Sequence, residues 1–385
     1  MNTQKSALSP PTDAFDTACV HAATEPDPGT GAIAPPIYLS TTFERDADGG
    51  YPRGYRYSRE GTPNRTSLEA TVAALEGGLA ACAFSSGLAA NMAVLEQLEP
   101  GDRIVAAHIG YHGTHRQLKE IVARRGVAVE FVDTGDLAAV ERAVDARTRL
   151  VWAETPANPL LGITDLRGVS EIAHVRGARL VCDSTFATPY CQQPFTCGAD
   201  LIIHSGTKYL GGHSDVLSGF VVVGDDAELL TRLRDWQSLS GSGLAPFDCW
   251  LLRRSISTLA VRMQRQCATA LELARWLSAH PAIESVLYPG LPGHPGHAVA
   301  VRQMPGGFGA MLSIRVRGDG ARALGVAART RLFRRATSLG GVESLIEHRA
   351  SIEGPGTSTP ANLLRVSIGI ENADDLRRDL DAALT

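Results

Sequence analysis

Lys208 lies in a sequence setting that would let its amine react with an aldehyde. It follows the apolar run 201–203, which predicts a buried strand, and it comes shortly after Ser205 and Thr207. An amine condenses with an aldehyde to a Schiff base, and nearby hydroxyls could bind a phosphate on the same molecule. A solvated surface lysine is the simpler alternative, but it would not explain the buried strand before Lys208 and the Gly-Gly turn after it.

Two other predicted strand ends carry groups that suit such a molecule. Asp183 follows the apolar run 180–182. An ionised aspartate could keep a pyridine nitrogen protonated. A protonated ring can accept the electrons that are left on the substrate Cα when its proton is removed. An aspartate that caps a turn is an equally good interpretation of this position alone. Segment 84–88 runs into a helical pattern, whose free N–H groups could bind phosphate, although an ordinary serine N-cap looks the same. Together the three elements indicate pyridoxal 5′-phosphate.

A sheet is needed to bring these strand ends together. Short apolar runs alternate with helical patterns along the chain, which predicts an α/β fold with a largely parallel sheet covered by helices. Catalytic groups gather at the carboxyl ends of the strands in such sheets. The predicted strands are 80–84, 103–107, 127–132, 150–153, 180–182, 201–203 and 220–223, and the predicted helices are 66–76, 88–99, 117–124, 137–145 and 166–175.

The composition changes along the chain and predicts three parts. Residues 1–65 are rich in Pro, Gly, Thr and Tyr and are expected to form an extended arm that contacts a neighbouring subunit. Residues 66–250 are predicted to form a large cofactor-binding domain, and 251–385 a small C-terminal domain, with the boundary inside a long helix over 250–280. The small domain is expected to contain strands 311–316 and 364–367 and helices 321–328 and 373–384.

Composition and charge exclude several classes of partner. A formal net charge of −4 over 385 residues offers no basic field for nucleic acid, and no apolar run approaches the roughly 18 residues of a membrane span. The seven cysteines contain no C-x-x-C pair, which favours reduced thiols in the cytoplasm. His108, His112 and His115 are separated by glycines that interrupt any helix, so no metal site is expected. A small-molecule substrate is predicted.

Many segments, in chain order, resemble the Cys/Met-metabolism transsulfuration enzymes, a family that includes cystathionine γ-synthase, cystathionine γ-lyase and methionine γ-lyase. The resemblance extends from about residue 17 to residue 383, and it implies the aspartate-aminotransferase-like fold called fold type I. The matching segments are Tyr57-Ser-Arg-Glu-Gly, Leu75-Glu-Gly-Gly, Phe84-Ser-Ser-Gly, Glu154-Thr-Pro-Ala-Asn-Pro159, Asp183-Ser-Thr-Phe-Ala-Thr-Pro189, His204-Ser-Gly-Thr-Lys-Tyr-Leu-Gly-Gly-His213, Ser338-Leu-Gly-Gly-Val-Glu-Ser344 and Arg365-Val-Ser-Ile-Gly369.

The resemblance implies a role for each polar residue in these segments. Lys208 would hold the cofactor as a Schiff base and act as the general base, Asp183 would bind the pyridine nitrogen, and Tyr111 would stack on the ring and carry a proton to the leaving group. Phosphate would be bound by Gly87, Leu88, Ser205 and Thr207, and the substrate carboxylate and neighbouring cofactor oxygens by Asn158, Ser338 and Arg365.

Tyr57 and Arg59 would complete the phosphate site of a neighbouring subunit. The resemblance therefore implies at least a dimer with shared active sites, and typically a homotetramer. A planar guanidinium suits a phosphate group. The alternative for these two residues is a surface cation–aromatic pair.

Departures from the family pattern leave the substrate open. Thr337 stands where many cystathionine-processing members have a glutamate, which weakens cystathionine as the substrate. His112 replaces a common glycine and Arg349 a common proline, which leaves room for an unusual γ-leaving group. We predict γ-elimination or γ-replacement on a homoserine- or homocysteine-derived amino acid. The alternatives are β-elimination, as in a cystathionine β-lyase, and a non-catalytic scaffold of the same fold.

Overall fold

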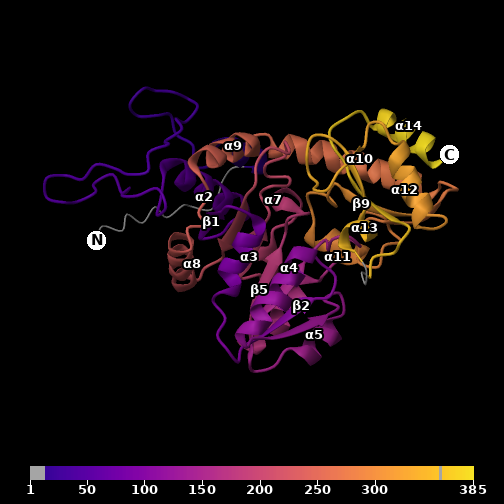
Figure 1. Cartoon of the computed structure of the whole chain (residues 1–385), viewed down its shortest axis with the longest axis horizontal. Helices are drawn as coiled ribbons and strands as arrows, with labels where there is room; N and C mark the ends of the chain where they lie inside the picture. Colours follow the sequence, from indigo (N-terminus) through magenta and orange to yellow (C-terminus); the bar gives the residue numbers. More distant parts are fainter. Residues whose placement is uncertain (1–13, 355–357) are drawn as a thin grey trace.

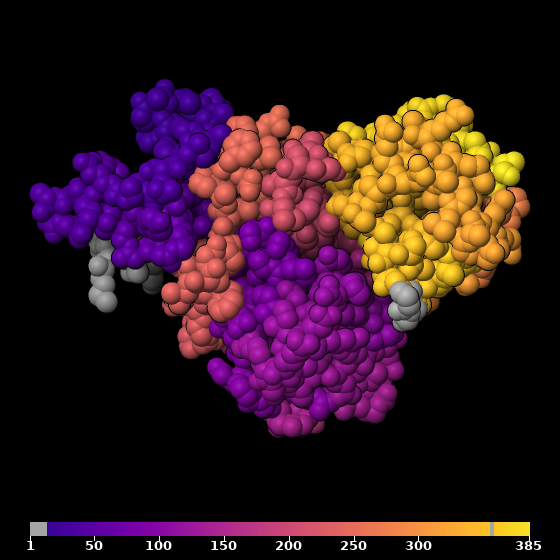
Figure 2. All heavy atoms as spheres, in the orientation of Figure 1, coloured from indigo at the N-terminus to yellow at the C-terminus, as the bar shows by residue number. Residues whose placement is uncertain are grey.

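The structure is a computed structural model that describes residues 14–354 and 358–385. The extended arm predicted over residues 1–65 is wrong at both of its described ends, where helix α1 (Phe15–His21) and the first residues of helix α2 (Pro63–Glu76) lie. Between these helices the segment has no regular helix or strand, as its composition predicted, and residues 1–13 of the predicted arm lie outside the described range. This segment projects from one side of the molecule (Figures 1 and 2). Ile33 and Leu39 on it are 79% and 71% exposed. Exposed apolar side chains on an extended segment suit packing against another chain.

The centre of the molecule is a seven-stranded mixed sheet with the order β1-β7-β6-β5-β4-β2-β3. β7 runs antiparallel to both of its neighbours, and every other adjacent pair is parallel. The predicted α/β fold with a largely parallel sheet is confirmed. The strands are β1 (Ala80–Phe84), β2 (Arg103–Ala107), β3 (Ala128–Val132), β4 (Thr148–Glu154), β5 (Arg179–Asp183), β6 (Leu201–His204) and β7 (Gly219–Val223).

Helices cover both faces of this sheet, because alternate side chains of each strand point to opposite layers. In β4, Leu150 and Trp152 pack in one apolar layer with residues of α3 and α8, while Val151 and Ala153 pack in the other with α5 and α6. The helices of this part are α2 (Pro63–Glu76), α3 (Gly87–Leu95), α4 (His112–Gln117), α5 (Leu137–Ala143), α6 (Leu166–Val175), α7 (Thr188–Cys191) and α8 (Ala227–Leu239), with a 3-10 turn η3 (Pro194–Cys197).

The helix predicted over 117–124 is wrong in its limits and its regularity. α4 already begins at His112 and continues through Gly113, so this glycine does not interrupt the helix as the sequence led us to expect. The chain continues as a π-helical turn η1 (Leu118–Val122) and a 3-10 turn η2 (Ala123–Arg125). This stretch ends at Gly126, whose φ of 84° lies in the left-handed region that glycine adopts at little cost.

A second sheet of five strands, in the order β10-β11-β12-β9-β8, forms the C-terminal part at the opposite side from the arm (Figure 1). Only β10 and β11 run parallel. Its elements are β8 (Ile283–Leu287), α11 (His297–Gln303), β9 (Met311–Val316), α12 (Gly320–Arg329), β10 (Arg334–Arg335), β11 (Leu345–His348), α13 (Arg349–Glu353), β12 (Leu363–Ser367) and α14 (Ala373–Leu384).

The single helix predicted over 250–280 is wrong, since two helices occupy this stretch. α9 (Pro246–Ile256) ends and α10 (Leu259–Ser278) begins around Ser257 and Thr258. Ser257 Oγ accepts a hydrogen bond from Arg253 at 2.9 Å, and Thr258 Oγ1 donates one to the Ser255 carbonyl at 3.1 Å. Hydroxyl side chains that bond to nearby backbone and side-chain groups compete with regular helix, which explains the break.

Six strand ends meet at one edge of the large sheet. Strands β1 to β6 all point their carboxyl ends there, because β2 to β6 run parallel to one another and β1 and β6 are both antiparallel to β7. Segments that follow these strands therefore lie side by side. Within the described ranges, no helix is long and apolar enough to cross a membrane.

Candidate active site

A cavity of about 690 Å³ lies at this edge, between the large sheet and the C-terminal part. Its walls contain residues that are far apart in the sequence and that come from both sheets. The structure brings the following predicted residues together in this cavity: Gly87, Leu88, Tyr111, Asn158, Asp183, Ser205, Thr207, Lys208, Thr337, Ser338 and Arg365.

Lys208 follows β6 and directs its amine into the cavity, where Nζ donates a hydrogen bond to Ser338 Oγ at 2.9 Å. Burial lowers the pKa of the Lys208 amine from 10.5 to about 8, and the positive charges of Arg365 and Arg349 act in the same direction. Glu347 opposes this shift. A lysine with a lowered pKa is neutral, and therefore nucleophilic, in a larger fraction of molecules near neutral pH.

The lowered pKa of Lys208 makes cofactor uptake depend on pH. We expect the rate at which cofactor-free protein takes up pyridoxal phosphate to rise up to about pH 8 and then level off, because the neutral amine is the reactive form. For an ordinary lysine the rise would continue to about pH 10.5. Stopped-flow absorbance between pH 6 and pH 10 measures the rate. A rise that continues through pH 10 would contradict a neutral Lys208 near pH 8.

Asp183 ends β5 and lies beside Glu154, which ends β4 at the paired position. Burial raises the pKa of Asp183, and burial together with the charge of Asp183 raises the pKa of Glu154 to about 8. Two carboxyl groups in one low-dielectric site resist double ionisation. A cation such as a protonated ring nitrogen beside Asp183 would relieve that conflict, so the pair fits a positively charged ligand group.

Glu154 lines this cavity, but the sequence did not lead us to assign it a role. Its two oxygens accept hydrogen bonds from the backbone N–H groups of Tyr111 and Asn158, both at 2.7 Å. One buried carboxyl thus fixes the loop after β2 to the turn after β4. The signal available in the sequence was that two neighbouring apolar runs, 150–153 and 180–182, are each followed directly by an acidic residue.

The ring of Tyr111 occupies space that only a glycine leaves open. A Cβ on Gly113 would lie 2.6 Å from Cε1 of Tyr111 and 3.0 Å from Cδ2 of Leu88. Both neighbours line the cavity together with Gly113. The phenol therefore stands at the cavity wall, where it can contact a bound ring.

The end of the cavity that is formed by the start of α3 and the loop after β6 suits a phosphate. Gly87 and Leu88 are the first residues of α3, so the helix itself provides no acceptor for their N–H groups. A helix start attracts anions. A Cβ on Gly87 would lie 3.0 Å from Cβ of Ser205, so glycine is needed for the helix start to lie this close to the loop before Lys208. Thr207 completes this end, and its Oγ1 also donates to the Ser218 carbonyl at 3.1 Å.

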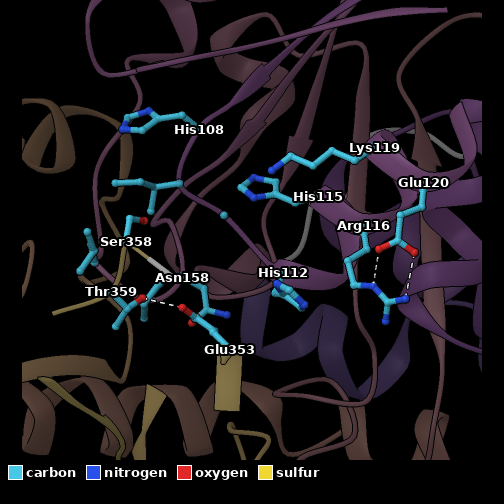
Figure 3. A pocket seen from close by; sticks show the side chains of 14 residues that line it. His108, His112, His115, Arg116, Lys119, Glu120, Asn158, Glu353, Ser358 and Thr359 are labelled. Carbon is cyan, nitrogen blue, oxygen red and sulfur yellow. Dashed lines mark hydrogen bonds and ion pairs between the residues drawn. The ribbon is translucent and has the colours of Figure 1, made fainter. Parts of the chain in front are cut away.

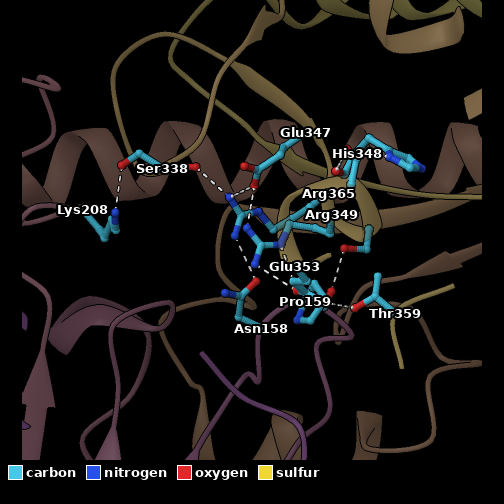
Figure 4. Close-up of polar contacts among 12 residues, drawn as sticks. Asn158, Pro159, Lys208, Ser338, Glu347, His348, Arg349, Glu353, Thr359 and Arg365 are labelled. Carbon is cyan, nitrogen blue, oxygen red and sulfur yellow. Dashed lines mark hydrogen bonds and ion pairs between the residues drawn. The ribbon is translucent and has the colours of Figure 1, made fainter. Parts of the chain in front are cut away.

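Arg365 lies at the centre of a polar network at the other end of the cavity (Figure 4). Its guanidinium donates to Asn158 Oδ1 at 3.0 Å, to the Ser338 carbonyl at 2.9 Å and to Glu347 Oε2 at 2.5 Å. Arg365 is 4% exposed, and burial lowers its pKa to about 10. Ser338 has a φ of +80°, a conformation that costs a serine of order 1 kcal/mol and that its contacts to Arg365 and Lys208 hold in place.

Tyr57 and Arg59 do not line this cavity. The Arg59 guanidinium lies over the Tyr57 ring, 5.6 Å from its centroid, and donates to the Ser238 carbonyl at 2.9 Å. Tyr57 is 44% exposed. In a single chain these residues form the cation–aromatic pair that the sequence left as the alternative.

A second cavity of about 660 Å³ adjoins the first and shares His112, Arg116, Asn158 and Glu353 with it (Figure 3). His108 and His115 also line it, but His115 Nε2 is bonded to the Ala107 carbonyl at 2.9 Å. Among the described residues, no group of three or more His, Cys, Asp or Glu side chains is arranged to hold a metal ion.

The three parts of the first cavity are complementary to three chemical groups on one molecule. Lys208 can react with an aldehyde, Asp183 can pair with a basic ring nitrogen, and the start of α3 can bind an anion. Pyridoxal 5′-phosphate carries all three groups, and the fold and this cavity together define an enzyme that depends on it.

Comparison with known proteins gives the family. Residues 16–385 match the model of the Cys/Met metabolism PLP-dependent enzymes. The chain is 47% identical to a cystathionine gamma-synthase of Mycobacterium tuberculosis over 374 residues, 96% of each chain, and 44% identical to a cystathionine beta-lyase of Coxiella burnetii over 379 residues, 96% of this chain and 97% of the other. A crystal structure of metB from Corynebacterium glutamicum superimposes with a TM-score of 0.95 at 45% identity, and the match covers 98% of this chain and 99% of that one. The chain belongs to this family, which confirms the predicted fold and cofactor.

Proposed function

We propose that this enzyme catalyses γ-elimination or γ-replacement on a γ-substituted, homoserine- or homocysteine-derived amino acid. The observation that carries the proposal is the position of Lys208 between Asp183, on the large sheet, and Arg365, on the small sheet. When bound, pyridoxal phosphate supplies an electron sink for the charge that develops at the substrate Cα. The name of the M. tuberculosis relative supports γ-chemistry.

Different residues of the chain bind the substrate, remove its protons and protonate the leaving group. Arg365 and Asn158 orient the substrate through its α-carboxylate, because a buried guanidinium binds carboxylates with charge-assisted hydrogen bonds. The neutral Lys208 amine removes the Cα proton, as a general base with a pKa of about 8 can do near neutral pH. After it has released that proton to solvent and is neutral again, it removes the proton at Cβ. Tyr111, at the cavity wall, donates a proton to the group that leaves from Cγ.

β-Elimination is the second candidate, and the name of the C. burnetii relative supports it. The two reactions share the first proton transfer and differ in which carbon loses its substituent. Thr337 lines the cavity and is uncharged. It provides no partner for the distal ammonium of cystathionine, so we rank an unusual γ-substituent above cystathionine.

The products distinguish these reactions. The experiment is incubation of the purified holoenzyme with cystathionine, O-acyl-homoserines and methionine, with and without an added thiol. Release of 2-oxobutanoate without thiol is expected for γ-elimination, and a new thioether in the presence of thiol is expected for γ-replacement. Pyruvate as the sole 2-oxo acid from cystathionine would overturn the γ-assignment and establish the β-reaction.

We further propose that the active enzyme is a cytoplasmic homotetramer built from dimers with shared active sites. Tyr57 and Arg59 lie outside the cavity of their own chain, on an irregular segment that projects from the molecule and exposes Ile33 and Leu39. All seven cysteines fall within the described ranges and are free thiols, which supports a reducing compartment.

If the active sites are shared between two chains, two inactive variants should regain activity when they form a mixed dimer. Arg59→Ala and Lys208→Ala are each expected to have little activity. A hybrid dimer restores one complete site, in which Lys208 comes from one chain and Arg59 from the other. After unfolding and joint refolding of a 1:1 mixture, half of the dimers are hybrids, so about a quarter of native activity is expected. Activity that is no higher than the mean of the two variants would show that each chain completes its own site.

A further inference from the structure

Arg365 shares its surroundings with a second buried arginine, Arg349, at the start of α13 (Figure 4). One carboxylate oxygen, Oε2 of Glu347, contacts both guanidinium groups, at 2.5 Å from Arg365 and 3.0 Å from Arg349. On its other side Arg349 donates to Oε1 of Glu353 through Nη2 at 2.9 Å and through Nε at 3.2 Å. The side chains of Arg365, Glu347 and Arg349 are 4%, 5% and 7% exposed.

The four groups form a charge-balanced cluster with two guanidiniums and two carboxylates. Balance matters here because charges in a low-dielectric site interact more strongly than in water. The cluster is the end of the cavity at which an amino-acid carboxylate would bind to Arg365. Without Arg349, the same place would hold one cation and two carboxylates, and it would repel a third carboxylate.

Glu347 occupies a donor of Arg365 that a substrate carboxylate would need. The second oxygen of Glu347, Oε1, is buried without a hydrogen-bond partner among the described residues. A carboxylate that is held by two cations can shift from one to the other while it stays paired. Arg349 provides the place to which Glu347 can shift.

We propose that Arg349 is a positioning residue for substrate recognition: it pairs with Glu347 and thereby leaves Arg365 available for the α-carboxylate of the amino-acid substrate. This inference rests on the proposed function, because it assumes an amino-acid substrate. It also gives a physical role to one of the positions at which the sequence departs from the common family pattern. Arg349 need not touch the substrate to act in this way.

The test compares two ligands that differ only in the carboxylate. 2-Aminobutanoate and propylamine are titrated into holoenzyme, and binding is followed through the visible absorption of the bound cofactor. For Arg349→Met we expect the dissociation constant of 2-aminobutanoate to rise about 10- to 100-fold, the range expected for loss of a hydrogen bond to a charged group. The dissociation constant of propylamine is expected to be unchanged.

A second substitution provides the rescue. Glu347→Gln together with Arg349→Met restores the balance, with one guanidinium and one carboxylate, so affinity for 2-aminobutanoate is expected to recover to within a few-fold of native. Arg349→Lys, which keeps the charge, is expected to lie between native and Arg349→Met. The matched control is Arg378→Met on α14, which removes an exposed arginine paired with Asp375 and should alter neither ligand.

Several outcomes would overturn the proposal. An equal loss of affinity for both ligands in Arg349→Met, or a double variant no better than the single one, would assign Arg349 a purely structural role. Unchanged affinity for both ligands would mean that Glu347 does not compete for Arg365. Failure of the proposed function looks different: native protein that takes no amino-acid substrate would not bind 2-aminobutanoate with a spectral change, and a β-lyase would bind it but give pyruvate as the sole 2-oxo acid from cystathionine.

Discussion

Replacement of Lys208 by alanine is expected to lower kcat by about 10³-fold or more. In the proposed mechanism the substitution removes both the amine that holds the cofactor and the general base, and loss of a general base alone typically costs 10²- to 10⁴-fold. The measurement is the initial rate of 2-oxo acid or thioether formation at saturating substrate, with the visible spectrum of the same sample. Full turnover with an unchanged spectrum would contradict the role given to Lys208.

The chain provides an unusually clean control for this experiment. It contains only three lysines, at positions 5, 119 and 208. Lys119→Ala removes an ammonium that lies over the Phe131 ring, 5.0 Å from its centroid, and is expected to leave cofactor binding intact. Borohydride reduction of the holoenzyme followed by peptide mass analysis should place the cofactor on Lys208. A label on Lys119 would assign the attachment site elsewhere.

Asp183→Asn is expected to lower kcat by about 10²- to 10³-fold, the usual cost of removing one preorganised electrostatic contact from an active site. A neutral amide cannot hold a ring nitrogen in its protonated form, so the developing charge at Cα loses its sink. The rate is compared with that of Asp183→Glu, which keeps the charge. A native rate in Asp183→Asn would refute the pairing.

The melting temperature of Asp183→Asn shows whether its loss of activity has a chemical cause or results from misfolding. Burial raises the pKa of Asp183, which means that the ionised carboxylate is unfavourable in the cofactor-free protein. An amide of the same shape carries no such cost, so cofactor-free Asp183→Asn should unfold at the same temperature as native protein or at a higher one. A large drop in melting temperature would instead assign the lost activity to misfolding.

The large sheet could be predicted from the sequence because its strands are buried on both faces. Such strands appear as continuous apolar runs, and β1 and β2 have the predicted limits. Prediction was weaker where hydrogen bonds of polar side chains compete with the regular backbone bonds of a helix. The break between α9 and α10 depends on side-chain contacts of Ser257 and Thr258, which an apolar period does not show.

The site could be predicted wherever its residues follow strands in recognisable segments. Asp183 ends β5 and Lys208 follows the adjacent strand β6, and the parallel pairing of these strands brings their ends together. The cluster around Arg365 could not be predicted, because Glu347 of β11 meets Arg365 of β12, and Arg365 meets Asn158 after β4, only through tertiary packing. The family resemblance named Arg365 but gave no information on the charges that surround it.

The cavity has one wall on each sheet, so any molecule that fills it connects the two sheets. A ligand that contacts Asp183 and Lys208 on one side and Ser338 and Arg365 on the other joins segments about 150 residues apart in the sequence. Unfolding of either part then requires release of the ligand, so binding free energy adds to the free energy of unfolding. At a ligand concentration one hundred times the Kd this amounts to about 2.7 kcal/mol. The concentrations of cofactor and substrate would thus affect the stability of the folded protein as well as its rate of turnover.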